Sequence, residues 1–333
     1  MHIQVTPTIK DYLNRLKINN SKIELNDFLD GYVDIKDEKV AIKELKQAGE
    51  QDDIKSLFIE KKDYINNPYL KNISFKDIKL KDFSYETVTI EKGYLFNIDE
   101  IQDDKNKELN DYMILRAYKQ DTDMMFLKQG KQEWMMASIS EFRTNDPYAK
   151  KAHGNIITFG LGIGYFIYMA SLNENVKSIT VIERSKEVIE LFDQIKDQFP
   201  NKKIDIINGD AFDYFNERCL KQFDYIYVDI YQNNVDGRIM IEKLLEQYLP
   251  PYDSCNFWIE NSCLSIVKSL IFIYYYEQVY KTKIKIEKNN IKLMNKVRWY
   301  LDNLDLNVND VEILKQIMYN KQLIREILHT KVS

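Results

Sequence analysis

Residue types that could bind a nucleotide gather between positions 155 and 229. Gly160, Gly162 and Gly164 fall within five positions of the stretch NIITFGLGIGYFIYMAS, although the chain of 333 residues has only ten glycines. Glycine has no Cβ and tolerates a positive φ, so it permits a tight turn and lets a ligand approach the backbone. The cluster predicts a nucleotide-binding turn or, alternatively, a tight strand-to-helix turn without a ligand.

Three acidic residues end or follow later apolar runs. Glu183 ends SITVIE, Asp210 follows KIDIIN and Asp229 ends DYIYVD. A carboxylate at the position of Glu183 can accept hydrogen bonds from both hydroxyl groups of a ribose. Asp210 could bind an adenine amino group, and Asp229 would point into the same crevice.

Each acid also has a structural interpretation. Glu183 could cap the following helix, and Asp210 could be the N-cap of a helix that begins at Ala211. Asp229 could be an acid on a surface loop. The joint placement of one acid at each of three successive strand ends favours a ligand site.

Strands and helices in alternation must position these residues. The runs NIITF, SITVIE, KIDIIN and DYIYVDI read as strands. Between the second and third runs, SKEVIELFDQIKDQF has an apolar face with helical spacing and Ser185 as a plausible N-cap. This alternation predicts a parallel sheet covered on both faces, with ligands beyond the carboxyl ends of its strands.

The rest of the chain shows other periodicities. Ile9, Tyr12, Leu13 and Leu16 have the spacing of one helix face, as do Ile54, Leu57 and Phe58. Apolar residues alternate with polar ones from about 70 to 140, and the chain after 264 reads mostly as helix. The predicted parts are a helical N-terminal segment (1–68), a small antiparallel β-domain (69–150), a Rossmann-like, doubly wound, mostly parallel α/β domain (151–264) and a helical C-terminal segment (265–333).

Composition narrows the class of protein. The net charge is −5 and the sequence pI about 5.5, so no global basic field attracts nucleic acid or an acidic membrane. Lys268 interrupts the apolar stretch CLSIVKSLIFIYYY, which we interpret as a buried helix and not as a membrane contact. Three cysteines suit a reducing compartment, and the first residues lack the apolar core of a secretory signal. We expect a cytoplasmic protein, and the scattered histidines predict no metal site.

The motifs ITFGLGIGYF, ITVIERS, INGDAF and FDYIYVDIY, in this order, resemble those of the class I S-adenosylmethionine-dependent methyltransferase superfamily. Their spacing is similar to that of its spermidine synthase-like branch. There a β-domain strand carries a glutamine and is followed by an EF dipeptide, as Gln132 and Glu141–Phe142 are placed here. The resemblance covers about residues 125 to 260.

The resemblance implies a role for each residue that matches a motif. Gly160, Gly162 and Gly164 would contact the methionine portion of S-adenosylmethionine or of its decarboxylated form. Glu183 would bind the ribose hydroxyls, and Asp210 and Ala211 would bind adenine. Gln132 would reach over the cofactor. Asp229 would lie beside the reacting carbon and the incoming nucleophile, as the catalytic residue.

Departures from the branch concern the acceptor. Ile163 stands where an aspartate usually contacts the aminopropyl group, and Thr144 stands where a tyrosine usually binds the polyamine. We therefore expect a methyltransferase that acts on a small-molecule acceptor. The alternatives are an aminopropyl- or aminocarboxypropyl-transferase and a non-catalytic module that binds S-adenosylmethionine. A nicotinamide-dependent dehydrogenase is disfavoured, because its third glycine would fall at Tyr165. The helical ends could shape the acceptor pocket or form a homodimer surface.

Overall fold

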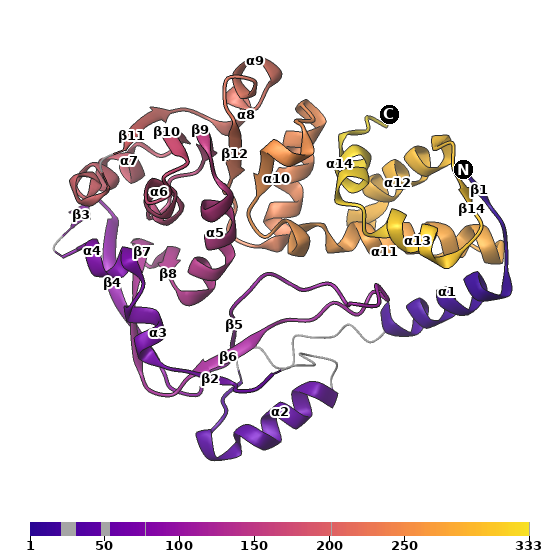
Figure 1. The fold of residues 1–333 in the computed structure, drawn as a ribbon, viewed down its shortest axis with the longest axis horizontal. Helices are drawn as coiled ribbons and strands as arrows, with labels where there is room; N and C mark the ends of the chain where they lie inside the picture. Colours follow the sequence, from indigo (N-terminus) through magenta and orange to yellow (C-terminus); the bar gives the residue numbers. More distant parts are fainter. Residues whose placement is uncertain (21–30, 48–53, 77, 201, 333) are drawn as a thin grey trace.

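A five-stranded parallel sheet lies at the centre of the fold (Figure 1). The computed structural model describes residues 1–20, 31–47, 54–76, 78–200 and 202–332. The strands are β9 (Gly154–Phe159), β10 (Val176–Glu183), β11 (Lys203–Asn208), β12 (Tyr225–Val228) and β13 (Cys255–Phe257). They lie in the order β11-β10-β9-β12-β13, and every neighbouring pair is parallel. The four strands expected from the sequence are confirmed; the short β13 was not expected.

The order of the strands reverses at β9. The chain moves outward from β9 to β10 and β11, then returns to place β12 on the other side of β9. In open parallel sheets, ligands bind at such a switch point, outside the carboxyl ends of the two central strands. The turn after β9 and the loop after β12 therefore occupy the expected place for a site.

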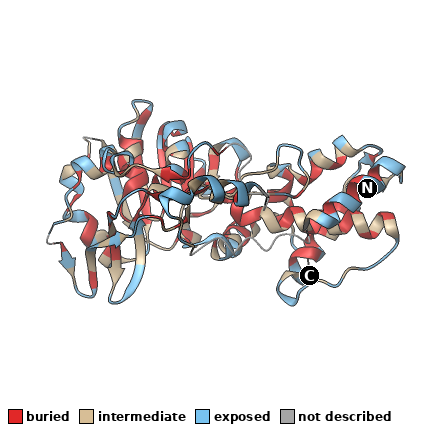
Figure 2. Cartoon of the chain, turned by 90° about the horizontal axis from the view of Figure 1, so that it is seen from below, coloured by how far each residue is buried: buried red, intermediate tan, exposed pale blue. Residues whose placement is uncertain are grey.

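Both faces of the sheet are covered. Ile156 and Tyr227 belong to a core shared with α5, α6 and α7, whereas Ile157 and Val228 belong to a core shared with α10 and α11. Side chains alternate between the faces along a strand, so strands buried on both sides must be apolar throughout. Figure 2 shows buried residues in the sheet region and in the helical region that carries both termini.

The connections around this sheet are mostly helical. They comprise α5 (Ile139–Lys151), α6 (Tyr165–Ser171), α7 (Lys186–Asp193), the 3-10 turn η3 (Lys196–Gln198), α8 (Ala211–Tyr214), α9 (Glu217–Leu220), α10 (Asn234–Gln247), η4 (Tyr252–Ser254) and α11 (Glu260–Tyr280). The Ser185 hydroxyl accepts the N–H of Val188 at 3.2 Å, as expected for the N-cap of α7. The helix ends at Asp193, earlier than the pattern predicted, but Ile195 and Phe199 are still buried.

Two small sheets precede the central one. One is antiparallel, in the order β3-β4-β7-β8, and the other has the order β2-β6-β5. Their strands are β2 (Phe58–Ile59), β3 (Lys79–Leu80), β4 (Phe83–Ile90), β5 (Phe96–Asn97), β6 (Leu115–Tyr118), β7 (Thr122–Gln129) and β8 (Gln132–Ala137). The short helical elements beside them are η2 (Ile35–Asp37), α2 (Glu38–Gln47), α3 (Lys61–Ile65) and α4 (Pro68–Asn72).

The predicted helix face at Ile54, Leu57 and Phe58 is wrong. Phe58 lies in β2 and pairs in parallel with Ala117 of β6. All three side chains are buried in a small apolar cluster with residues of β6 and the β5 region, so tertiary packing overrides the local spacing. The predicted helix face at Ile9, Tyr12, Leu13 and Leu16 is confirmed, because all four side chains are fully buried on α1 (Pro7–Asn20).

The two ends of the chain form one helical region. Strand β1 (His2–Ile3) pairs in parallel with β14 (Asn307–Val308), and α1 packs on α11 and on α13 (Val311–Met318). The remaining elements here are η5 (Lys288–Asn290), α12 (Ile291–Asn303) and α14 (Lys321–His329). Helix α11 carries the apolar stretch around Lys268 and is largely buried, as expected. Within the described part of the chain, no helix has the length and apolarity needed to cross a membrane.

A buried ion pair connects α14 to α11. The Arg325 guanidinium donates to both carboxylate oxygens of Glu260, with Nε–Oε1 at 2.6 Å and Nη2–Oε2 at 2.7 Å. Both side chains are almost completely buried. Removing one partner of such a pair leaves a buried charge without compensation, which costs far more than losing an exposed pair.

Arg325→Met should lower the free energy of unfolding by about 3–5 kcal/mol, because it leaves the buried Glu260 carboxylate without its partner. Urea denaturation of purified protein measures this loss. Arg15→Met is the control, since its pair with Asp11 is exposed and should be worth at most about 1 kcal/mol. Adding Glu260→Gln to Arg325→Met should restore part of the stability. Equal losses in the two single variants would contradict the assignment.

Candidate functional site

The turn after β9 has the backbone geometry that its glycines predicted. Gly160, Gly162 and Gly164 have φ values of +95°, +52° and +79°, in the left-handed region. A Cβ on Gly160 would overlap the backbone carbonyl of Asp229, so only glycine lets the ends of β9 and β12 lie this close. The tight turn is therefore real, and it places Asp229 directly beside the turn.

The other two glycines have different neighbours. A Cβ on Gly162 would overlap the thioether of Met135, a residue of β8 in the preceding small sheet. A Cβ on Gly164 would lie 2.9 Å from ring atoms of Phe192 and Phe199, so this glycine lets α6 pack closely. Gly162 thus faces the Met135 side chain, and Gly164 faces the core.

Glu183 joins the glycine turn to the next helix. Its Oε2 accepts the N–H of Leu161 at 3.0 Å, and its Oε1 accepts the N–H of Ser185 at 2.7 Å. Burial raises the pKa of Glu183, while these N–H groups act in the opposite direction. Each carboxylate oxygen can accept a second hydrogen bond, so the structural role leaves room for ribose hydroxyls.

Asp210 is the N-cap of α8, which was one of its two interpretations. Its Oδ1 accepts the N–H of Phe212 at 3.0 Å, and α8 begins at Ala211 as expected. The carboxyl group is partly exposed at the end of β11, next to the end of β10. Its predicted contact with adenine, together with Ala211, stays a prediction.

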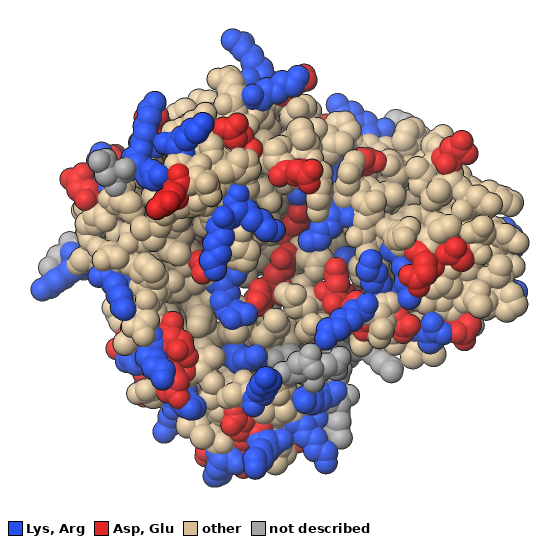
Figure 3. All heavy atoms as spheres, in the orientation of Figure 1, with Lys and Arg blue, Asp and Glu red and all other residues tan. Residues whose placement is uncertain are grey.

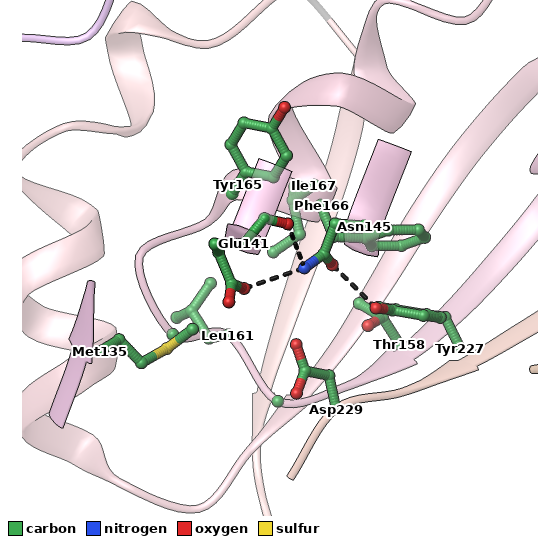
Figure 4. A pocket seen from close by; sticks show the side chains of 12 residues that line it. Met135, Glu141, Asn145, Thr158, Leu161, Tyr165, Phe166, Ile167, Tyr227 and Asp229 are labelled. Carbon is green, nitrogen blue, oxygen red and sulfur yellow. Dashed lines mark hydrogen bonds between the residues drawn. The ribbon is translucent and has the colours of Figure 1, made fainter. Parts of the chain in front are cut away.

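Asp229 lines a small cavity at the switch point (Figure 4). The cavity of about 20 Å³ has room for about one water molecule. The Asp229 side chain accepts no hydrogen bond from any described residue, although its backbone N–H binds the Phe159 carbonyl at 2.9 Å. Asp229 lies in the loop after β12, partly exposed, and its carboxyl group faces the cavity without a donor among the described residues.

A second carboxyl group faces the same cavity. Glu141 on α5 is only 9% exposed, and its Oε1 accepts from the Asn145 amide at 2.9 Å. The Asn145 oxygen accepts the Tyr227 hydroxyl at 2.8 Å, which fixes the amide orientation. Figure 4 shows the Glu141 and Asp229 carboxyl groups and the Met135 thioether around one space. Glu141 entered the sequence analysis only as part of the EF dipeptide that carries the family resemblance. That dipeptide was the one sequence signal that pointed to Glu141 as a site residue.

Burial dominates the electrostatics of this carboxyl pair. It raises the pKa of Glu141 to about 7, against the hydrogen bond from Asn145. Burial also raises the pKa of Asp229 well above its usual range, and the neighbouring Glu141 raises it further. Two buried carboxyl groups that share a site do not both ionise readily, because like charges repel in a low dielectric.

Gln132, which was expected over the cofactor, and two residues that follow Asp229 lie outside the cavity lining. Gln132 starts β8, exposed and paired with Gln129, and it does not line the cavity; Met135, further along β8, does. Tyr231 is buried and donates to the Trp258 carbonyl. Asn233 is the N-cap of α10. The sequence pattern could not show which β8 residue reaches the turn, because the register of β8 depends on its pairing with β7.

Charged side chains of both signs gather on one face of the molecule. Figure 3 shows a hollow near the centre of this face, with acidic side chains inside it and lysines and arginines around it. No group of three or more histidine, cysteine or acidic side chains in the described ranges could hold a metal ion.

Comparisons with known proteins give only remote similarities. No family model matches the chain, and no curated protein matches it. A spermidine synthase from Thermotoga maritima aligns with a TM-score of 0.30 and 13% identity, over 48% of this chain and 60% of that one. A shikimate dehydrogenase from Mycobacterium tuberculosis aligns with a TM-score of 0.23 and 12% identity, over 56% and 61%. The chain therefore spans less than two thirds of either protein.

The strand order and the glycine turn define a Rossmann-like α/β protein, as the sequence predicted. Its candidate site is the crevice between the ends of β9 and β12, bordered by Glu183 of β10 and by Glu141 of α5.

Gly160→Ala should destabilise the protein by about 3 kcal/mol or more, since the new Cβ meets a backbone carbonyl at a left-handed residue. Gly162→Ala should cost less, because it meets a flexible thioether. Met135→Ala should therefore restore part of the stability lost in Gly162→Ala, the rest being backbone strain at φ +52°, and should leave Gly160→Ala unimproved. Thermal and urea unfolding of the four variants test this ranking, and equal rescue of both glycine variants would refute it.

Proposed function

We propose that this protein is an S-adenosylmethionine-dependent transferase that moves a methyl group to a small-molecule acceptor. The observation that carries the proposal is the Glu183 carboxylate, which binds the glycine turn from the end of β10, while Asp229 faces the same turn from the end of β12. This combines an acceptor for ribose hydroxyls with an acid where a nucleophile would approach.

The residues present fit such a cofactor. Glu183 can accept two further hydrogen bonds, Gly162 leaves the backbone open, and Asp210 has an oxygen beyond the one that caps α8. Ligand sites commonly measure about 300–1,000 Å³, so a cofactor enters only when Met135 leaves its position over Gly162. The unbranched methionine side chain permits such a movement.

The bound cofactor would supply an activated methyl group, so the protein mainly aligns a nucleophile with it. Asp229 would orient the acceptor and take its proton, which is typically worth about 10²–10⁴-fold in rate. Its unpartnered carboxyl oxygens suit this role.

Methyl transfer is preferred to aminopropyl transfer because of two positions. Ile163 is fully buried, and its carbonyl accepts the Tyr69 hydroxyl. The Thr144 hydroxyl donates to the Ser140 carbonyl at 2.8 Å and accepts from the Trp258 indole at 2.9 Å. Neither position offers a group that would bind the amine of an aminopropyl donor or a polyamine.

Calorimetry with S-adenosylmethionine, its demethylated product and its decarboxylated form tests the cofactor. The first two should bind, and the third should bind more weakly. Glu183→Gln should weaken binding by about 1–3 kcal/mol, because it removes a charge-assisted acceptor. Glu190→Gln, an exposed change on α7, is the matched control. Absence of binding by all three compounds would refute the proposal.

Asp229→Asn should keep cofactor affinity within a few-fold and lose turnover by about 10²–10⁴-fold, since asparagine keeps the shape without the basicity. A screen of amine, hydroxyl and thiol acceptors with mass detection measures the product. Putrescine with the decarboxylated cofactor should give little product. Efficient spermidine formation by the wild type would instead establish the aminopropyl alternative. Cofactor binding without turnover of any acceptor would favour the non-catalytic module.

A further inference from the structure

Two carboxyl groups line the cavity at the switch point, and the described residues donate few hydrogen bonds to them. Asp229 has no donor for either oxygen among the described residues, and Glu141 has one donor, Asn145, on one oxygen. Glu141 is buried and Asp229 is partly buried. Buried polar groups are nearly always hydrogen-bonded, and buried charges are nearly always paired. No lysine, arginine or histidine lines this cavity. A proton is the simplest cation that can compensate both carboxyl groups.

We propose that Glu141 is a positioning residue that shares one proton with Asp229 across the cavity, and so lets Asp229 accept the proton of an incoming nucleophile. This role rests on the proposed transferase function, but the shared proton itself requires no cofactor. The Glu141 Oε2 is available to hold the proton, while Asn145, fixed by Tyr227, holds Oε1 in place.

The other titratable groups near the pair do not take over this role. They are Tyr148 and Tyr165 on α5 and α6, Tyr227 and Tyr231 around β12, Cys263 and Glu260 on α11, and Glu100 before β6. Burial raises the pKa of each tyrosine and of the Cys263 thiol, so these groups stay neutral near pH 7. Glu260 is held by Arg325, and Glu100 accepts the backbone N–H of Asn261.

The proton balance of the step is simple. When the acceptor approaches, the shared proton lies on Glu141 and Asp229 is ionised. The acceptor bonds to the methyl carbon as the bond from that carbon to sulfur breaks, with its electron pair left on sulfur. The N–H or O–H proton of the acceptor passes to Asp229. The pair then holds two protons and releases one to solvent, which restores the starting state.

Carboxyl ¹³C NMR titration of the ligand-free protein tests the shared proton. The signals are assigned by their loss in Glu141→Gln and Asp229→Asn. Coupled groups interact by more than about one pH unit. Glu141→Gln should therefore lower the titration midpoint of Asp229 by at least about one unit, and Asp229→Asn should lower that of Glu141 by a similar amount, because coupling is reciprocal. Glu174→Gln, an exposed change before β10, should shift neither.

Midpoints unchanged in both variants would overturn the proposal. Circular dichroism checks the fold, and reciprocity means that either variant suffices if the other does not fold. Unchanged midpoints together with calorimetric binding of S-adenosylmethionine would remove Glu141 from the mechanism and leave the transferase proposal standing. Coupled midpoints without binding of S-adenosylmethionine would keep the shared proton and refute the transferase proposal.

Discussion

The close approach of two strand ends is the constraint on which the site depends. Gly160 directly follows β9. Because glycine has no side chain, the backbone carbonyl of Asp229 can lie where a Cβ would be. Because β9 and β12 are neighbours at the reversal of strand order, this contact brings together residues about seventy positions apart. Glu183 then holds the turn in place through the N–H of Leu161. The glycine turn is thus both a structural requirement and the edge of the site.

The chemistry of the site follows from its lack of cations. Glu141 and Asp229 face a cavity that contains no basic side chain, and burial makes their ionised forms costly. A charged partner supplied by the protein would have fixed both groups as carboxylates. Without one, burial raises the pKa of both carboxyl groups above their usual range.

The helical ends of the chain support the sheet from one side. Helix α11 follows β13 and packs on α10, while α1, α12, α13 and α14 pack around α11. The pair between Arg325 and Glu260 fixes α14 at the start of α11, close to the loop that follows β12.

The sequence by itself determined the central sheet and the positions of its polar ends. Short apolar runs that alternate with a helical pattern favoured strands buried on both faces, and a cluster of glycines favoured a left-handed turn. Four of the five strands and the turn were therefore predictable from local chemistry. The same holds for Ser185 at the start of α7. Tertiary structure alone decided that Glu141 and Met135 reach the turn while Gln132 does not, and that Phe58 forms a strand. It also decided that α1 joins the C-terminal helices. These outcomes depend on register and on contacts between distant segments, and periodicity encodes which face of an element is apolar without specifying the surface that will cover it.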